Sequence, residues 1–581
     1  MLLAARGLHV RQLHTANLIQ LAAYCRLLTA DYTFIAIFVH HNIFMLKRFS
    51  HQLLQLTTGQ LAALGILLCF PAFLIHLGLI AFIGDEGIRT LVAFEMKMSG
   101  NFIVPTLNGE LYFNKPPLYN WMIYGMSMIF GHFGEWPSRL TTLISLGAFG
   151  WFVYYFVSRY MDKLAGITMA LLVITSGRIL FWDSMLGLID ISFSAVIYLN
   201  FMVMYHFGKT GKWKAMFLLS YLLMSIAFLL KGFPAVVFQG ISILTTLILF
   251  KNFKHKILSA AHIGGALIGL LPIIIYYLAY AKQVSLAEAF SILTDQSMQR
   301  TVTHHGFKET LLHVVTFPLE EMYHFLPWTL LILPYFHPKF RTWLRENEFV
   351  RFNFWLMMVN LPVYWLSVQV FPRYLLMFIP MFNLVGYYML QRSLAWSLTW
   401  WKIIHITFVV LASLGTLVVL LMLVYTPVRN IPGSLLIWLF ASAAMACCLL
   451  GLIADAPRMF LWMALALLVV RSAFNLVVLP IRATGYQENI CRTDCQRVTG
   501  NHPGEKFYIY GQTPTENVAR FYLSAYSNQL IRVSDIADDP AALYIVEKTM
   551  YPEFPGMQLD SVITERENIL GVMKLQSKTG D

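Results

Sequence analysis

The chain has 581 residues, of which 58% are hydrophobic and 12% are charged, and its formal net charge is +12. A soluble globular protein carries about 25% charged residues, so this composition excludes that class. Runs of roughly 20 apolar residues recur along most of the chain and predict a polytopic helical membrane protein. Because Lys and Arg gather in short loops between these runs, the positive charge indicates membrane topology and not nucleic-acid binding.

Residues 1–44 are mildly basic and precede the first long apolar run. Their apolar patch, Tyr32 to Val39, is too short to span a bilayer. Met45 is followed by Lys47 and Arg48 just ahead of the first apolar run, so Met45 is a plausible alternative translation start. We therefore expect residues 1–44 to be a dispensable extension or a mis-assigned start. The membrane domain is then expected to comprise residues 45–480.

The apolar windows predict an all-α membrane domain of about thirteen spanning helices. They lie at roughly 57–82, 138–158, 165–181, 187–207, 215–231, 233–250, 257–280, 323–337, 352–370, 373–391, 403–425, 434–454 and 458–479. Every loop that joins an even-numbered helix to the next carries Lys or Arg, so these loops share one side, the cytoplasm. The opposite side receives the loops at 84–121 and 281–322 and everything after residue 480. This predicts a multi-pass membrane protein with a cytoplasmic N-terminus and a C-terminal domain on the opposite, outer side.

The loop 84–121 is the longest polar interval in the first half of the chain. Asp85 and Glu86 follow directly on the apolar run, where acids either sit in headgroup water or serve a function. Apolar residues at helical spacing between Ile88 and Met96 predict an interfacial amphipathic helix, with Arg89 and Lys97 available to lipid headgroups. Residues 118–131 are apolar but short, and they predict a second helix at the outer interface.

Beyond about residue 480 the composition becomes that of a small soluble α/β domain, residues 481–581. Residues 504–511, 528–535 and 541–548 are strand-like, and residues 516–526 are helix-like. Cys491 and Cys495 stand at the entrance of this domain. A disulfide between them and two free thiols are both compatible with the sequence.

Ionisable residues gather on the predicted outer face. Single residues of this kind often cap a helix, pair structurally or extend toward headgroup water. Together, acids and fixed cations suit a reaction on an anionic lipid headgroup, because cations hold the phosphate while a carboxylate orients or deprotonates the attacking group. The candidates are Asp85, Glu86, Lys115, Asp183, Asp190, Lys231, Arg300, His304 and Arg373.

The segment DEGIRTLVAFEMKMSGNFIVPTLNGELYFNKPPLYNWMI resembles the first periplasmic loop of the GT-C membrane glycosyltransferases. Within them it is closest to the protein O-mannosyltransferase and lipid A aminoarabinose transferase group. The resemblance continues through DSML, LLKGFPA, DQSMQRT, FLPW and PRYLL in the family's order, and it covers about residues 57–395. It implies a GT-C fold and transfer of a sugar from a polyprenyl (undecaprenyl) phosphate, by inverting single displacement, to a lipid A, protein or glycan acceptor. It also implies that the protein lies in a bacterial inner membrane, with the reaction and the C-terminal domain on the periplasmic side.

The resemblance also implies roles for individual residues. Asp85 matches the catalytic base or acceptor-orienting acid and Asp183 a second acid of that site, with Glu86 beside them. Lys115 and Arg300 match the cations that hold the polyprenyl phosphate, and Lys231 and Arg373 match cations that line its pocket. Secondary candidates for acceptor binding are Asn114, Asp190 and His304.

Asn114 departs from the family, which commonly has Glu before Lys-Pro. Asn114 thus removes a carboxylate that helps some members bind a metal or acceptor. The resemblance therefore does not decide whether a divalent metal binds, and Asp85 and Asp183 are expected to act alone or with Glu86. Two other functions stay open as well. One is a transporter or flippase of a lipid-linked sugar, and the other is a non-catalytic assembly or receptor subunit that binds through its C-terminal domain.

Overall fold

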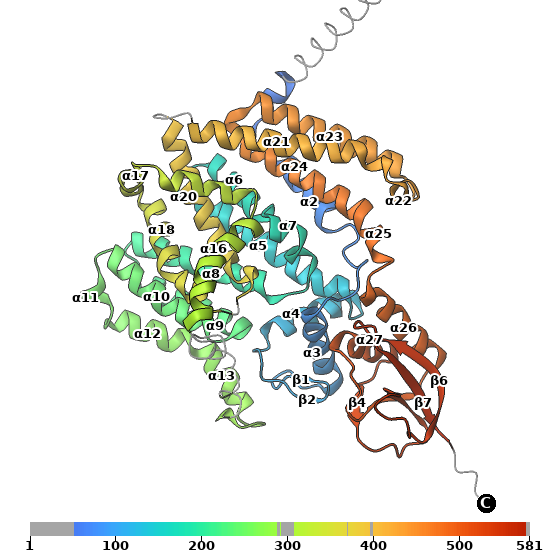
Figure 1. The fold of residues 1–581 in the computed structure, drawn as a ribbon. Helices are drawn as coiled ribbons and strands as arrows, with labels where there is room; N and C mark the ends of the chain where they lie inside the picture. Colours follow the sequence, from blue (N-terminus) through green and yellow to red (C-terminus); the bar gives the residue numbers. More distant parts are fainter. Residues whose placement is uncertain (1–50, 288–290, 292–306, 369, 395–398, 577–581) are drawn as a thin grey trace, which may run out of the picture.

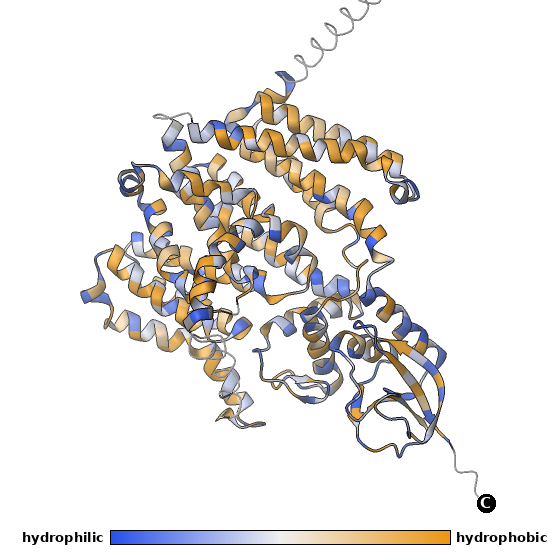
Figure 2. Ribbon diagram, viewed as in Figure 1, coloured by the Kyte–Doolittle hydropathy of each residue, from blue (hydrophilic) through white to orange (hydrophobic). Residues whose placement is uncertain are grey.

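The computed structural model describes residues 51–287, 291, 307–368, 370–394 and 399–576. The extension 1–44 and the candidates Arg300 and His304 lie outside these residues. Figure 1 shows a helical membrane domain whose helices lie side by side, with a separate sheet-containing domain at the C-terminal end of the chain. Figure 2 shows that hydrophobic residues dominate the membrane domain, whereas hydrophilic and hydrophobic residues are interspersed in the C-terminal domain.

Eight helical stretches in the described part of the chain are long and apolar enough to cross a membrane, which makes this a multi-pass membrane protein. A ninth is present if α6 (Lys163–Ile174) and Gly177–Met185, bent by 49°, form one broken span. The eight are α5 (Glu135–Tyr160), α8 (Ile189–Lys209), α9 (Trp213–Lys231), α12 with α13 (Ala260–Gly269 and Leu271–Tyr280), Pro372–Ser393, Thr399–Val424, α23 (Ser434–Ala454) and Ala456–Ala483.

The remaining predicted windows are helical but shorter. They hold α2 (Thr58–Phe73), α10 (Pro234–Leu249), the end of α16 (Phe307–His324) with the 3-10 helix Trp328–Phe336, and α18 (Glu348–Asn360) with α19 (Pro362–Trp365). The count of thirteen spans therefore stays a prediction.

The chain leaves its first apolar helix earlier than predicted. A helix over 57–82 was expected, but α2 ends at Phe73, two residues after Pro71. His76 then takes a positive φ of 60°, and the chain continues through turns to Gly84. The prediction was wrong because hydropathy registers only that residues 74–82 are apolar. Hydropathy does not indicate which groups form hydrogen bonds with the backbone N–H and C=O groups of these residues.

The outer loop folds into two helices and a small hairpin: α3 (Asp85–Ser99), β1 (Thr106–Leu107), β2 (Glu110–Leu111) and α4 (Leu118–Phe130). Both predicted helices are present. The expectation that Arg89 faces lipid headgroups was wrong, because Arg89 is buried. Lys97, at the other end of α3, is exposed.

The C-terminal domain is a five-stranded mixed sheet with two helices, and its strands lie in the order β4-β3-β5-β7-β6. The first three strands are parallel, and β7 and β6 extend the sheet antiparallel. The three predicted strands and the predicted helix are confirmed. The elements are α26 (Gln487–Asn501), β3 (Lys506–Tyr510), α27 (Asn517–Ser527), β4 (Arg532–Ser534), β5 (Ala542–Val546), β6 (Gly556–Ile563) and β7 (Ile569–Leu575).

Two features of this domain differ from or refine the sequence analysis. Strands β6 and β7 were not predicted. In the edge strand β6, Val562 is the one buried residue and the sequence GMQLDSVI contains no continuous apolar run. Cys491 and Cys495 are free thiols on α26, with their sulfur atoms 4.0 Å apart.

Two glycines one turn apart hold α9 and α12 in direct contact. A Cβ added to Gly269 would lie 2.3 Å from Cβ of Tyr221, and one added to Gly265 would lie 2.7 Å from Cβ of Phe217. Small residues four apart let membrane helices approach closely, and here Ser225 also donates a hydrogen bond to the Gly269 carbonyl. This contact fixes α9, whose last residue is Lys231.

Gly269→Ala is expected to destabilise the protein by about 1–3 kcal/mol, because the added methyl overpacks the α9–α12 contact. Thermal unfolding of the detergent-purified protein measures this. Gly264→Ala is the matched control, because a Cβ there has no heavy atom within 4 Å. Equal melting temperatures for the two variants would contradict the importance of this contact.

Candidate functional site

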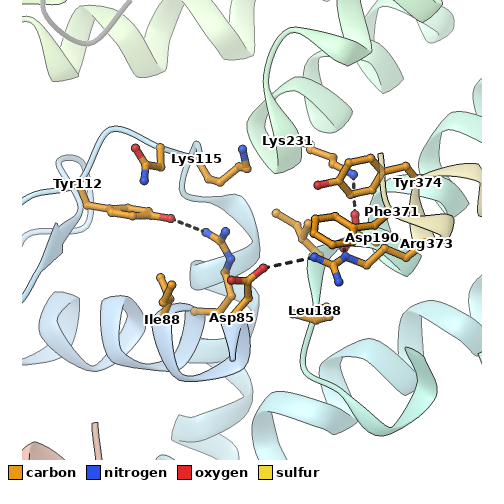
Figure 3. A pocket seen from close by; sticks show the side chains of 13 residues that line it. Asp85, Ile88, Tyr112, Lys115, Leu188, Asp190, Lys231, Phe371, Arg373 and Tyr374 are labelled. Carbon is orange, nitrogen blue, oxygen red and sulfur yellow. Dashed lines mark hydrogen bonds and ion pairs between the residues drawn. The ribbon is translucent and has the colours of Figure 1, made fainter. Parts of the chain in front are cut away.

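A polar cavity of about 260 Å³ lies where α3, the outer hairpin and the ends of two membrane helices meet. Figure 3 shows its lining side chains converging from these elements. Six of the predicted site residues line it: Asp85, Asn114, Lys115, Asp190, Lys231 and Arg373. Three of these side chains come together because they lie at the ends of their helices. Asp85 is the first residue of α3, Asp190 lies in the first turn of α8, and Lys231 is the last residue of α9.

Asp190 holds two cations on the pocket wall. Its carboxylate is 2.5 Å from Nζ of Lys231 and 3.1 Å from Nε of Arg373, and its side chain is only 7% exposed. Lys231 also lies over the ring of Tyr374, with Nζ 3.5 Å from the ring centroid. Since an unpaired buried charge is strongly destabilising, each partner fixes the others in place. Asp190 is thus a structural partner of the pocket cations.

Asp85 is the more accessible of the two pocket acids. Its side chain is 54% exposed, and one carboxylate oxygen lies 3.3 Å from Nη2 of Arg373. Arg373 therefore bridges Asp85 and Asp190 (Figure 3). An exposed carboxylate at the mouth of a cationic cavity can reach a second molecule that arrives from solvent.

The sequence analysis missed the role of Arg89. This side chain is buried, lines the pocket and donates a hydrogen bond from Nη1 to the hydroxyl of Tyr112 at 3.0 Å. Its position offered a signal, because residue i+4 of a helix lies on the same face as residue i, here Asp85. The same spacing suits an amphipathic helix, so the sequence did not separate the two roles.

Glu95 holds the hairpin that leads to Lys115. Its buried carboxylate accepts hydrogen bonds from the hydroxyl of Thr106 and from the backbone N–H groups of Asn108 and Gly109, at 2.6, 2.6 and 3.2 Å. Burial raises the pKa of Glu95 above its usual value, although these donors oppose the shift. Asn108 and Gly109 both have positive φ, as a tight two-residue turn requires. Glu95 thereby fixes where the chain returns toward the pocket.

The pocket carries an excess of two positive charges. Its lining has four cations, Arg89, Lys115, Lys231 and Arg373, against two carboxylates, Asp85 and Asp190. Such a cavity favours an anion, and arginine and lysine donors are the groups that proteins use to bind phosphate.

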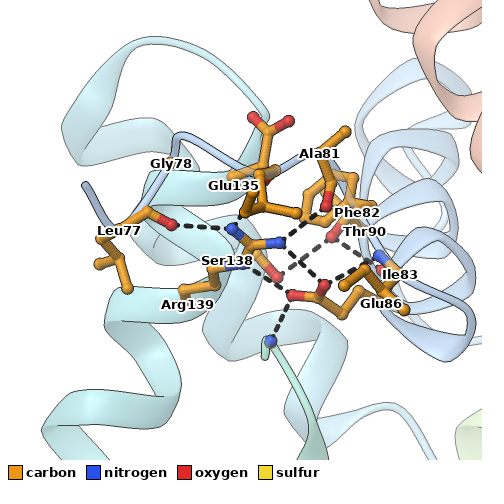
Figure 4. Close-up of polar contacts among 12 residues, drawn as sticks. Leu77, Gly78, Ala81, Phe82, Ile83, Glu86, Thr90, Glu135, Ser138 and Arg139 are labelled. Carbon is orange, nitrogen blue, oxygen red and sulfur yellow. Dashed lines mark hydrogen bonds and ion pairs between the residues drawn. The ribbon is translucent and has the colours of Figure 1, made fainter. Parts of the chain in front are cut away.

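Glu86 lies outside this pocket and is bound on both oxygens (Figure 4). Arg139 pairs with it through Nε and Nη2, both at 2.9 Å, and the backbone N–H groups of Ile83 and Gly187 donate to it. The side chain is fully buried. Glu86 therefore anchors the start of α3 and does not face a reactant.

Asp183 is likewise buried away from the pocket lining. One of its oxygens lies 3.2 Å from Nε of Arg178, and its side chain is 3% exposed. Two of the three acids that the sequence analysis grouped as catalytic, Glu86 and Asp183, thus do not line the cavity, and Asp85 does. Within the described ranges, no three His, Cys, Asp or Glu side chains are grouped so as to hold a metal ion.

The comparisons with known proteins agree with this architecture. Residues 114–277 match the family model described as dolichyl-phosphate-mannose-protein mannosyltransferase. ArnT from Cupriavidus metallidurans bound to undecaprenyl phosphate superposes with a TM-score of 0.63 at 17% identity, covering 90% of this chain and 100% of that one.

The apo state of the same ArnT gives a TM-score of 0.59 at 16% identity, with coverages of 89% and 98%. No curated protein matches the sequence. The predicted GT-C fold and the predicted resemblance to GT-C glycosyltransferases of the mannosyltransferase and ArnT type are confirmed.

Glu86→Gln is expected to destabilise the protein by about 3–5 kcal/mol, because it leaves the Arg139 charge buried without its counter-ion. Asp85→Asn, one residue earlier, is the control. Its half-exposed pair should contribute at most about 1 kcal/mol. Chemical unfolding of both purified variants tests this. Wild-type stability of Glu86→Gln would show that the buried pair does not anchor α3.

Proposed function

We propose that this protein is a glycosyltransferase that moves a sugar from a polyprenyl-phosphate carrier to an acceptor at the outer face of a bacterial inner membrane. One observation carries the proposal: four cations and two carboxylates converge in a single cavity at the ends of membrane helices. The GT-C fold and the match to a mannosyltransferase family model support it.

The cations hold and stabilise the carrier phosphate. In the donor the phosphate is a diester with one negative charge, and after transfer it is a monoester whose second pKa is about 6. Negative charge therefore grows on the leaving group during the reaction, and fixed cations that meet this charge lower the barrier. We assign this task to Lys115 and Arg89 together with Lys231 and Arg373, joined by Arg300 from the long outer loop.

Asp85 serves the acceptor. The acceptor hydroxyl or amine attacks the anomeric carbon, the bond from that carbon to the phosphate oxygen breaks, and the carrier leaves as polyprenyl phosphate. Asp85 accepts or directs the proton that the attacking group loses. Attack from the side opposite the phosphate inverts the anomeric configuration. Asn114 and His304 are assigned to acceptor binding, Asp190 to positioning of Lys231 and Arg373, and Glu86 and Asp183 to support of the site from outside the cavity.

The location of the charges favours chemistry over transport. Transporters place their functional charges near the bilayer midplane, between broken helices. Here Asp85, Asp190 and Lys231 all lie at helix ends. By the positive-inside rule these ends face the periplasm, together with the C-terminal domain.

The test uses membranes containing the wild type, Asp85→Asn or Lys115→Ala, supplied with a set of radiolabelled polyprenyl-phosphate sugars. We expect label to move from lipid to an acceptor in the wild type. Each variant should lose activity on the order of 100-fold or more, as loss of a general base or a phosphate-stabilising donor does. Lys97→Ala, an exposed lysine of α3 outside the cavity, should transfer label as the wild type does.

The opposite outcome is also defined. If label crosses the bilayer with its linkage unchanged, in the wild type and in Asp85→Asn alike, the protein is a transporter and the transferase proposal is wrong.

A further inference from the structure

The segment that delivers Asp85 to the pocket is held by side chains from two distant parts of the chain. Between the end of α2 and the start of α3, residues 74–84 have no helix or strand to satisfy their backbone groups. Arg139 of α5 donates to the carbonyls of Leu77, Ile80 and Ala81 at 2.8, 2.8 and 3.0 Å (Figure 4). Buried backbone groups need such partners, so this segment cannot keep its shape alone.

The C-terminal domain supplies the other partners. Arg492 of α26 donates to the carbonyls of Gly78 and Leu79, at 3.2 and 3.0 Å. Asn489 of the same helix accepts a hydrogen bond from the N–H of Ala81 at 2.6 Å. Helix α26 and Arg139 thus bind neighbouring backbone groups of one short segment, the one that ends at Asp85.

Tyr522 of α27 connects this segment to α5. Its hydroxyl accepts a hydrogen bond from the N–H of Phe82 at 2.8 Å and donates one to Glu135 at 2.6 Å. The same oxygen of Glu135 accepts from Arg492 at 2.8 Å. Glu135 lies one helical turn before Arg139. The same end of α5 therefore binds the segment directly through Arg139 and, through Glu135, binds the two side chains of the C-terminal domain that hold it.

Packing reinforces these polar contacts. Phe82, Leu91 and Phe94 belong to the same hydrophobic core as α27 and the inner face of the C-terminal sheet. A Cβ added to Gly87, two residues after Asp85, would lie 2.9 Å from Cγ2 of Val518. The start of α3 therefore rests directly on α27.

We propose that the C-terminal domain is a positioning element of the pocket, and that Tyr522 is a positioning residue for Asp85. The domain is then part of the site and not a separate binding module. The inference rests on the proposed function for its catalytic readout. Asp85 lies on α3, whereas Lys231 and Arg373 lie outside that helix, so loss of the Tyr522 hydroxyl should misplace Asp85 while Lys231 and Arg373 keep their contacts with Asp190.

The experiment compares Tyr522→Phe with Tyr526→Phe in the full-length protein. Tyr526 is the matched control, because it lies one turn further along α27 with its side chain 41% exposed. Hydrogen–deuterium exchange of peptides covering residues 77–87 should be about tenfold faster in Tyr522→Phe, the effect of losing one protecting hydrogen bond. Exchange of β3 and β5 should be unchanged, and Tyr526→Phe should match the wild type.

Kinetics with the lipid-linked sugar that the wild type uses give the second readout. Tyr522→Phe should lower kcat on the order of 10-fold, with KM for the donor changed by less than about twofold, because the acceptor acid loses its orientation while three of the four pocket cations, Lys115, Lys231 and Arg373, lie outside α3. Gly87→Ala should also lower kcat. Adding Val518→Ala should restore part of it, since the smaller side chain relieves the contact.

Three results would overturn the proposal: wild-type exchange in residues 77–87 of Tyr522→Phe, a wild-type kcat for that variant, or a fall in kcat accompanied by loss of protection across β3 and β5. The last would assign Tyr522 to folding of the domain. If the wild type transfers no label at all, the proposed function fails, and the exchange arm still decides whether the C-terminal domain holds this segment.

Discussion

The buried pair of Arg139 and Glu86 is the interaction on which the outer face depends. The chain leaves α2 at Phe73, inside an apolar stretch, and must satisfy its backbone without helical hydrogen bonds before α3 begins. One guanidinium does much of this by binding three carbonyls and a carboxylate at once. Removing either partner would leave the other charge buried and unpaired, which strongly destabilises the folded protein. It fixes the first turn of α3, and with it one wall of the cavity.

Most of the charged residues that line the cavity could be predicted from the sequence, and the physical reason differs from residue to residue. Asp85, Lys231 and Arg373 each interrupt or end an apolar run. A charged side chain beside a membrane segment costs free energy, so its presence there indicates a function. Lys115 was found through a motif. Arg89 was misjudged because a cation on an amphipathic helix suits headgroup water as well as a pocket. What places Arg89 in the pocket is its hydrogen bond to Tyr112, a residue that follows the hairpin and lies far from Arg89 in the sequence.

Other features could not be predicted because their partners are remote. Residues 74–82 are as apolar as a spanning helix, yet they turn, and side chains from α5, α26 and α27 form hydrogen bonds with their backbone. Glu95 binds backbone N–H groups of a later turn, and backbone groups leave no mark in a sequence pattern. Glu86 stood next to Asp85 and shared its chemistry, yet one is fully buried and the other half-exposed. Local sequence indicates what a residue can do, while burial decides whether it can reach a reactant.

The unequal exposure of the two pocket acids divides the cavity into a buried part and a part open to solvent. Asp190 and its two cations are largely buried at the ends of apolar helices, whereas the side chain of Asp85 is 54% exposed. In the proposed reaction the lipid carrier and the acceptor therefore need not enter the cavity by the same route or displace one another on entry. Arg373 touches both acids and stands at the boundary. In the proposed reaction the transfer occurs beside Arg373, and the two products can leave by separate routes.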